Sequence, residues 1–193
     1  DVAPSRGLGD VYKRQIEESF RFNKNDIIVV GCSSGPDSMA LVDMLLKIRE
    51  KYQLSLIVAH VNHNLRKESA QEEAYLRNYC DRNKIMFECM MITEYGDDNF
   101  HNEARNIRYD FFEKVVYKYQ ANYLMTAHHG DDLIETVLMR ISRGSNLNGY
   151  GGFKKIVEMD GYKIVRPLLD FTKEELEAVS YTHLRAHETE LHL

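Results

Sequence analysis

Apolar and polar residues follow two periods along this chain, one typical of buried strands and one typical of amphipathic helices. Short β-branched runs such as Asp26–Gly31, which ends in a Ser/Gly-rich loop, predict strands. Apolar residues three or four positions apart, as in Met39, Val42 and Leu46, predict helices between these runs. The pattern predicts strands at 26–31, 54–60, 85–92, 122–126 and 163–165, and helices at 37–48, 69–83, 101–119 and 131–142.

This alternation of strands with longer helices defines an α/β protein. It predicts βαβ units, and therefore a parallel, doubly wound sheet of about five strands with helices on both faces. In such sheets, ligands bind beyond the carboxyl ends of the strands, where the strand order reverses. The polar clusters of this sequence directly follow the predicted strands, so we expect the functional site at that edge of the sheet.

The two ends of the chain differ in pattern from the body. Residues 1–15 show no apolar periodicity, and residues 180–193 interrupt the helix that Thr172 is expected to begin. We interpret these segments as a non-native leader and a non-native tail, with ordinary disordered termini as the alternative. The body, residues 16–179, is long enough for one domain with a sizeable core.

Composition narrows the class of protein. The net charge of −5 argues against a general nucleic-acid binder, which normally has a basic face. No apolar run reaches the roughly 18 residues of a membrane span, so no membrane anchor is expected. Cys32, Cys80 and Cys89 form no C-x-x-C pair, a pattern that fits a reducing cytoplasm better than a disulfide framework.

The segment from Gly31 to Ser38, Gly-Cys-Ser-Ser-Gly-Pro-Asp-Ser, separates the first strand from the first helix. Its small residues let the backbone approach a polyphosphate, and the helix N-terminus behind it offers free N–H groups. It has neither the G-K-S/T ending of the Walker loop nor the G-x-G-x-x-G spacing of dinucleotide folds. The alternative is a tight turn in which Ser34 or Asp37 caps the helix. The candidate phosphate-binding residues are Ser33, Ser34, Gly35, Pro36, Asp37 and Ser38, and Asp37 is also a candidate Mg²⁺ ligand.

Three further polar segments follow strands or open helices. His60–Arg66 follows the second strand, and because no cysteine or carboxylate pattern lies nearby, a satisfied polar turn is favoured over a metal site. Glu103–Tyr109 places Arg105 and Arg108 within one helical turn, so both guanidiniums can reach one anion, with a solvated arginine face as the alternative. Ala127–Thr136 places paired histidines before paired aspartates, which suit Mg²⁺ better than zinc, with simple partners of the helix dipole as the alternative.

Taken in order, these segments resemble one family. The loop resembles the S-G-G-x-D-S PP-loop of ATP pyrophosphatases, with Ser34 in place of the first glycine. A positive φ at Ser34 would therefore strain the backbone. The later segments resemble the H-V-N-H-x-L-R, A-R-x-x-R-Y, A-H-x-x-D-D-x-x-E-T, R-x-x-R-G and R-P-L-L motifs of tRNA(Ile)-lysidine synthases. The resemblance covers roughly residues 28–169 and identifies the body as the catalytic domain of that family.

The resemblance implies an enzyme that uses ATP and Mg²⁺ to adenylate the wobble cytidine of tRNA(Ile) and then joins L-lysine to it. The residues implied in catalysis are Asp37, Asp131, Asp132, Arg105 and Arg108, with Asp37 and Asp132 as metal ligands. The residues implied in ATP binding beside the loop are His60, Ala127, His128, Arg143 and Gly144. The family's later tRNA-binding domains are not expected in this chain, so tRNA binding should be weak, and a homodimer is left open.

Three alternatives remain at this point. A tRNA cytidine thiolase has the same loop but uses clustered cysteines, which the spacing of Cys80 and Cys89 disfavours. A nucleotide-binding module without catalysis would not require carboxylates at Asp37, Asp131 and Asp132. A truncated and inactive form of the synthase is the third.

Overall fold

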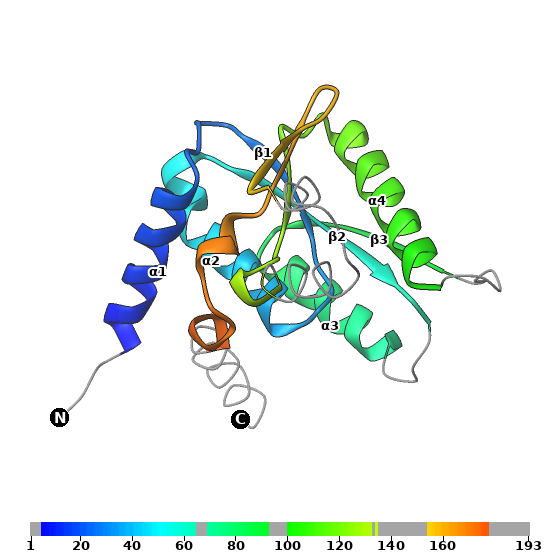
Figure 1. Ribbon diagram of the computed structural model, residues 1–193, viewed down its shortest axis with the longest axis horizontal. Helices are drawn as coiled ribbons and strands as arrows, with labels where there is room; N and C mark the ends of the chain where they lie inside the picture. The colour runs from blue at the N-terminus through cyan, green and yellow to red at the C-terminus, as the bar shows by residue number, and fades with distance from the viewer. Residues whose placement is uncertain (1–4, 65–68, 93–99, 133, 135–153, 178–193) are drawn as a thin grey trace.

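The computed structural model describes residues 5–64, 69–92, 100–132, 134 and 154–177. Six strands form one sheet in the order β3-β2-β1-β4-β6-β5 (Figure 1). Every neighbouring pair is parallel except β5 and β6, which are antiparallel. The strands are β1 (Ile27–Gly31), β2 (Ser55–Asn62), β3 (Met86–Met91), β4 (Tyr123–Thr126), β5 (Ile156–Glu158) and β6 (Lys163–Val165).

The predicted fold class is confirmed, with one addition. The five predicted strands correspond to β1, β2, β3, β4 and β6, and each lies within two residues of its expected ends. The additional strand, β5, has only three residues and pairs antiparallel at the edge of the sheet. So short a strand shows too few positions for a period of two to be recognised.

Helices cover both faces of the sheet, as the doubly wound arrangement requires (Figure 1). Alternate residues of β1 point to opposite faces: Ile28 and Val30 pack with α1, α2 and α3, whereas Val29 packs with α4. The helices are α1 (Ser5–Ser19), α2 (Pro36–Tyr52), α3 (Ser69–Arg82) and α4 (Phe100–Tyr119), and a 3₁₀ helix, η2, spans Pro167–Asp170. Among the described helices, none combines the length and apolar character needed to cross a membrane.

Helix α1 lies in a region where the sequence pattern predicts no element. Ile16 near its C-terminal end is fully buried, and Phe20 and Phe22 beyond it join the same core. The rings of Phe20 and Phe22 meet edge to face, with centroids 4.9 Å apart. Because helix propagation is easier than nucleation, this packed end can support the turns of the helix that precede it.

The strand order reverses between β1 and β4. From β1 the chain moves outward to β2 and β3, and α4 then returns it to β4 on the other side of β1. Gly31 at the end of β1 lies in register with Thr126 at the end of β4. The loop after β1 and the loop after β4 therefore start side by side, at the place where doubly wound sheets bind ligands.

Candidate active site

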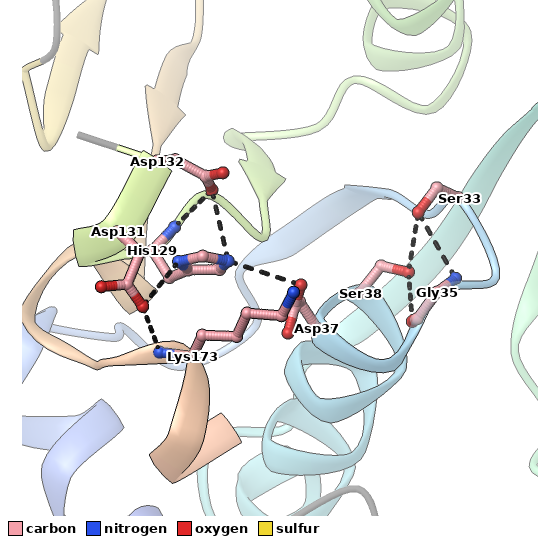
Figure 2. Close-up of polar contacts among 8 residues, drawn as sticks. All are labelled: Ser33, Gly35, Asp37, Ser38, His129, Asp131, Asp132 and Lys173. Atoms are coloured by element: carbon pink, nitrogen blue, oxygen red, sulfur yellow. Dashed lines mark hydrogen bonds and ion pairs between the residues drawn. The ribbon is translucent and has the colours of Figure 1, made fainter. Parts of the chain in front are cut away.

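Hydrogen bonds within the loop between β1 and α2 hold its shape (Figure 2). The Gly35 N–H donates to Ser33 Oγ at 3.4 Å, and Ser38 Oγ donates to the Gly35 carbonyl at 2.9 Å. The hydroxyl oxygens of Ser33 and Ser38 lie 3.3 Å apart. Because Ser38 gives its one hydrogen to Gly35, Ser33 is the donor to Ser38. Gly35 is the N-cap of α2, so this ring of bonds fixes the loop directly against the helix N-terminus.

The strained position of the loop is Ser34. Its φ is +67°, in the left-handed region that glycine adopts without steric cost. The retained glycine, Gly35, has an ordinary φ of −72°. Serine thus replaces the first glycine of the PP-loop pattern at the position where glycine is favoured. The positive φ of Ser34 therefore strains the backbone.

His60 anchors the loop to β2. The residue is 3% exposed, and its Nδ1 lies 2.9 Å from the carbonyl oxygen of Cys32. A carbonyl can only accept, so Nδ1 carries the hydrogen. Next to it, Asn62 donates to Glu73 at 2.9 Å and accepts from the N–H of Asn64. Because these side chains are engaged in hydrogen bonds with the loop and with α3, the polar turn is the better interpretation of this segment.

A cavity of about 500 Å³ opens between the ends of β1, β2 and β4, the N-terminal part of α4 and the loop. Its volume is within the range typical of sites for small molecules and cofactors. The predicted site residues that line it are Ser33, Asp37, Ser38, His60, Arg108, Ala127 and His128. Those that do not line it are Ser34, Gly35, Pro36, Arg105, Asp131 and Asp132. Arg143 and Gly144 lie outside the described residues.

The two arginines of α4 differ in environment. Arg108 lines the cavity, and burial lowers its pKa because the charged guanidinium loses hydration. Arg105 is exposed, and its guanidinium lies over the ring of Tyr109, 5.1 Å from the centroid. Only Arg108 is therefore placed to touch a ligand in the cavity, while Arg105 contributes its charge from the rim.

His128 lines the same cavity and is held in its neutral form. Burial, followed by the charge of Arg166, lowers the pKa of His128 to about 4, and Arg105 and Arg108 act in the same direction. Its Nδ1 lies 2.8 Å from the hydroxyl of Thr126. His128 is therefore uncharged at pH 7. The ionised side chains that line the cavity are the guanidinium of Arg108 and the carboxylates of Asp37 and Glu72, and Arg108 is the one placed to meet an anionic group of a ligand.

A second cluster brings three carboxylates around His129 (Figure 2). Its Nε2 lies 3.5 Å from Asp37 Oδ2 and 3.6 Å from Asp132 Oδ2, and its Nδ1 lies 3.9 Å from Asp131 Oδ2. Asp37 comes from the start of α2, and the two other aspartates open the helix that begins at residue 130. His129 was not among the predicted site residues, although paired histidines before paired aspartates were the available signal.

The carboxylates of this cluster have different environments. Desolvation by burial raises the pKa of Asp37, Asp132 and Glu177 raise it further, and His129 and Lys173 oppose the shift. Asp132 accepts a hydrogen bond from the backbone N–H of His129 at 3.0 Å. Asp131, whose side chain is half exposed, accepts from the backbone N–H of Lys173 at 2.7 Å. Asp131 therefore ties this helix to the segment after η2.

The three cysteines do not form a site for sulfur chemistry. All are free, and burial raises the pKa of Cys80 and of Cys89 to about 12. Burial also raises the pKa of Cys32. Since the thiolate is the reactive form, none of these thiols is set up as a nucleophile, and the three are not gathered in one group of potential metal ligands among the described residues.

Fold and site together define a class: an α/β nucleotide-binding domain whose small-residue loop, cavity with Arg108 at its wall and carboxylate cluster meet at the point where strand order reverses. The sequence profile of the PP-loop domain matches residues 9–189, and the chain belongs to this family.

Relatives in sequence are tRNA-modifying enzymes. The chain is 43% identical over 166 residues to the tRNA(Ile)-lysidine synthase of Enterococcus faecalis, an alignment that covers 86% of this chain and 36% of that protein. It is 34% identical over 180 residues to the synthase of Clostridium tetani, covering 90% and 38%. The chain thus spans little more than a third of the length of the curated relatives that it matches.

Solved structures support the fold. The U34-tRNA thiolase NcsA from Methanococcus maripaludis superposes with a TM-score of 0.78 at 18% identity, covering 90% of this chain and 62% of that one. The NH3-dependent NAD synthetase from Campylobacter jejuni superposes with a TM-score of 0.58 at 14% identity, covering 95% and 75%. At these identities the likeness concerns the fold alone.

Proposed function

We propose that this chain is the catalytic domain of a tRNA(Ile)-lysidine synthase, which joins lysine to the wobble cytidine of tRNA(Ile) through an adenylated intermediate. The observation that carries the proposal is the meeting of the PP-loop, Arg108 and the His128–Asp132 segment at the ends of β1 and β4. The identity of 43% to the Enterococcus faecalis synthase supports the choice of reaction.

In the first step, the O2 atom of the cytidine attacks the α-phosphorus of ATP, and the bond to the β-phosphate breaks to release pyrophosphate. The loop and the N-terminus of α2 bind the polyphosphate through backbone N–H groups and the helix dipole. Arg108, at the cavity wall, stabilises negative charge that develops at the α-phosphate. Neutral His128 can exchange a hydrogen bond with the nucleotide without adding charge.

The residues present fit a Mg²⁺ ion. Asp37 Oδ1 is buried and makes no hydrogen bond with the described residues, and Asp37 and Asp132 approach the same ring nitrogen of His129. Magnesium is commonly held by one or two carboxylates, with phosphate oxygens and waters as its other ligands. Asp37 and Asp132 would hold the ion, which would neutralise charge on the polyphosphate.

In the second step, the lysine amine attacks C2 of the adenylated cytidine, and the C–O bond to AMP breaks. Asp131 is half exposed beside this cluster and is our candidate for contact with the incoming amine. Lysine and tRNA(Ile) are thus the proposed partners and the cytoplasm the proposed location. The proposal does not specify an oligomeric state, and a homodimer is compatible with it.

The test is ATP–pyrophosphate exchange with an isoleucine tRNA transcript, Mg²⁺ and lysine added or withheld in turn. Exchange that requires the tRNA, together with transfer of labelled lysine to it, is expected. Asp37→Asn should abolish exchange, whereas Asp81→Asn on the exposed face of α3 should not. ATP binding without exchange would reduce the proposal to a nucleotide-binding domain, and no ATP binding would refute it.

A further inference from the structure

His129 lies at the junction of three segments that are distant in the sequence. It follows β4, it faces Asp37 at the start of α2, and the residue after it is held to the segment beyond η2. The N–H of Gly130 donates to the carbonyl of Phe171 at 2.9 Å. A Cβ at Gly130 would lie 3.1 Å from that oxygen, so the two backbones are in close contact.

The imidazole of His129 is almost completely enclosed, with 7% of its side chain exposed. Its Nδ1 makes no hydrogen bond with any described residue, whereas its Nε2 is the atom that Asp37 and Asp132 both approach, at 3.5 Å and 3.6 Å. A buried histidine that served only as core packing would be surrounded by apolar groups or by one satisfied partner. This ring instead separates two carboxylates from different elements.

The backbone of His129 also orients one of these carboxylates. Asp132 Oδ2 accepts the His129 N–H at 3.0 Å, and the helix begins at residue 130. This is the return half of a capping box, in which the third helical residue bonds back to the residue before the helix. The backbone thus sets where Asp132 lies, and the ring sets how far Asp132 lies from Asp37.

We propose that His129 is a positioning residue, whose Nε2 holds Asp37 and Asp132 at the spacing at which they jointly bind the metal ion of a metal–ATP complex. The proposal rests on the ATP and Mg²⁺ site proposed above. Partners that orient metal ligands typically change metal affinity by roughly 10- to 100-fold when they are removed. The role of His129 is one of geometry, because its Nε2 approaches both carboxylates, whereas the charge of Lys173 acts on Asp37.

The experiment compares His129→Gln with His129→Asn. Both replacements are neutral amides, but only glutamine extends far enough to place a nitrogen near the position of Nε2. Binding of α,β-methylene-ATP is measured by calorimetry with and without Mg²⁺, and Mn²⁺ binding in the presence of the same nucleotide is measured by electron paramagnetic resonance. Urea unfolding of both variants reports whether they fold.

We expect His129→Asn to weaken Mn²⁺ and Mg²⁺-dependent nucleotide binding by about tenfold or more, with metal-free nucleotide binding unchanged. His129→Gln should recover most of the loss. Equal behaviour of the two amides, a loss of metal-free binding of the same size, tighter metal binding, or unfolding of both variants would each overturn the proposal. If the unaltered chain showed no metal-dependent nucleotide binding, the proposed function itself would fail instead.

Discussion

At the scale of single residues, the loop combines a preformed ring of hydrogen bonds with one strained backbone position. Ser33, Gly35 and Ser38 close the ring, while Ser34 holds a φ of +67°. A left-handed conformation costs a residue other than glycine about 1–2 kcal/mol. The free energy stored at Ser34 is therefore comparable with that of one or two hydrogen bonds.

Ser34→Gly should stabilise the folded chain. The gain is expected to be about 0.5–1 kcal/mol, because relief of the positive φ is partly offset by the greater freedom of glycine in the unfolded state. Urea unfolding measures the change. Lys84→Gly is the matched control, since Lys84 has a φ of 54° on the exposed surface after α3. Both variants should gain stability, and only Ser34→Gly should also alter ATP affinity. A less stable Ser34→Gly would contradict the strain at this position.

His128 should make stability depend on pH between about 6.5 and 4. Its folded pKa of about 4 lies below the ordinary value near 6.5. In this window the unfolded chain binds more protons, so stability is complete above pH 6.5 and falls as the pH drops through the folded pKa. His128→Gln should lose less stability than the unaltered chain between pH 7 and 4.5, by roughly 1–3 kcal/mol. Urea midpoints at the two pH values provide the test, and parallel losses would be evidence against a neutral, buried His128.

At the scale of elements, the site depends on the close approach of α4 to β1. A Cβ built on Gly31 would lie 2.7 Å from Cε2 of Phe112, a ring that is 4% exposed. Glycine at the end of β1 therefore lets α4 pack close enough for Arg108 to reach the cavity wall. Gly31 has no positive φ. Glycine is therefore favoured at this position because a side chain would collide with Phe112, and not because of the backbone conformation.

Gly31→Ala should destabilise the chain by about 1–3 kcal/mol, the usual cost of overpacking a core. Phe112→Leu should relieve part of this cost, because the added Cβ would meet Cε2 and Cζ at the far end of the phenyl ring. A double-mutant cycle by urea unfolding measures the coupling between the two changes. Strictly additive effects would show that the glycine serves some other purpose.

At the scale of the whole molecule, the chain is acidic, with a net charge of −5. The cavity brings the guanidinium of Arg108 together with the carboxylates of Asp37 and Glu72. These groups suit a nucleotide bound with a metal ion, whereas a long polyanion such as tRNA is disfavoured by the net negative charge.

This net charge predicts weak tRNA binding by the chain. At physiological salt, the dissociation constant for isoleucine tRNA should lie in the micromolar range or above, about 10⁻⁶ M to 10⁻⁴ M. Filter binding at two salt concentrations measures it, with a non-cognate tRNA for comparison. Nanomolar binding would contradict the expectation of weak binding drawn from the acidic net charge.

The order of strands and helices could be predicted from the sequence, because strands buried on both faces of a parallel sheet are nearly continuous apolar runs. The polar segments that follow the strands also gather at one edge of the sheet, where Ser33, His60 and His128 line one cavity. The three-residue strand β5 and the helix α1 were not predicted. The first is too short to show a period, and the second is held by residues at its C-terminal end.

What the sequence determined by itself was chemical: which small, basic and acidic side chains follow which strands, and hence the family and the edge at which they gather. Only the tertiary structure decided the conformation of these residues and which of them lie together. The φ of Ser34 follows from closing the loop onto α2. The separation of Arg108 from Arg105 follows from how α4 packs on β1. The central place of His129 follows from strand order, because only the pairing of β1 with β4 brings Asp37 to Asp132.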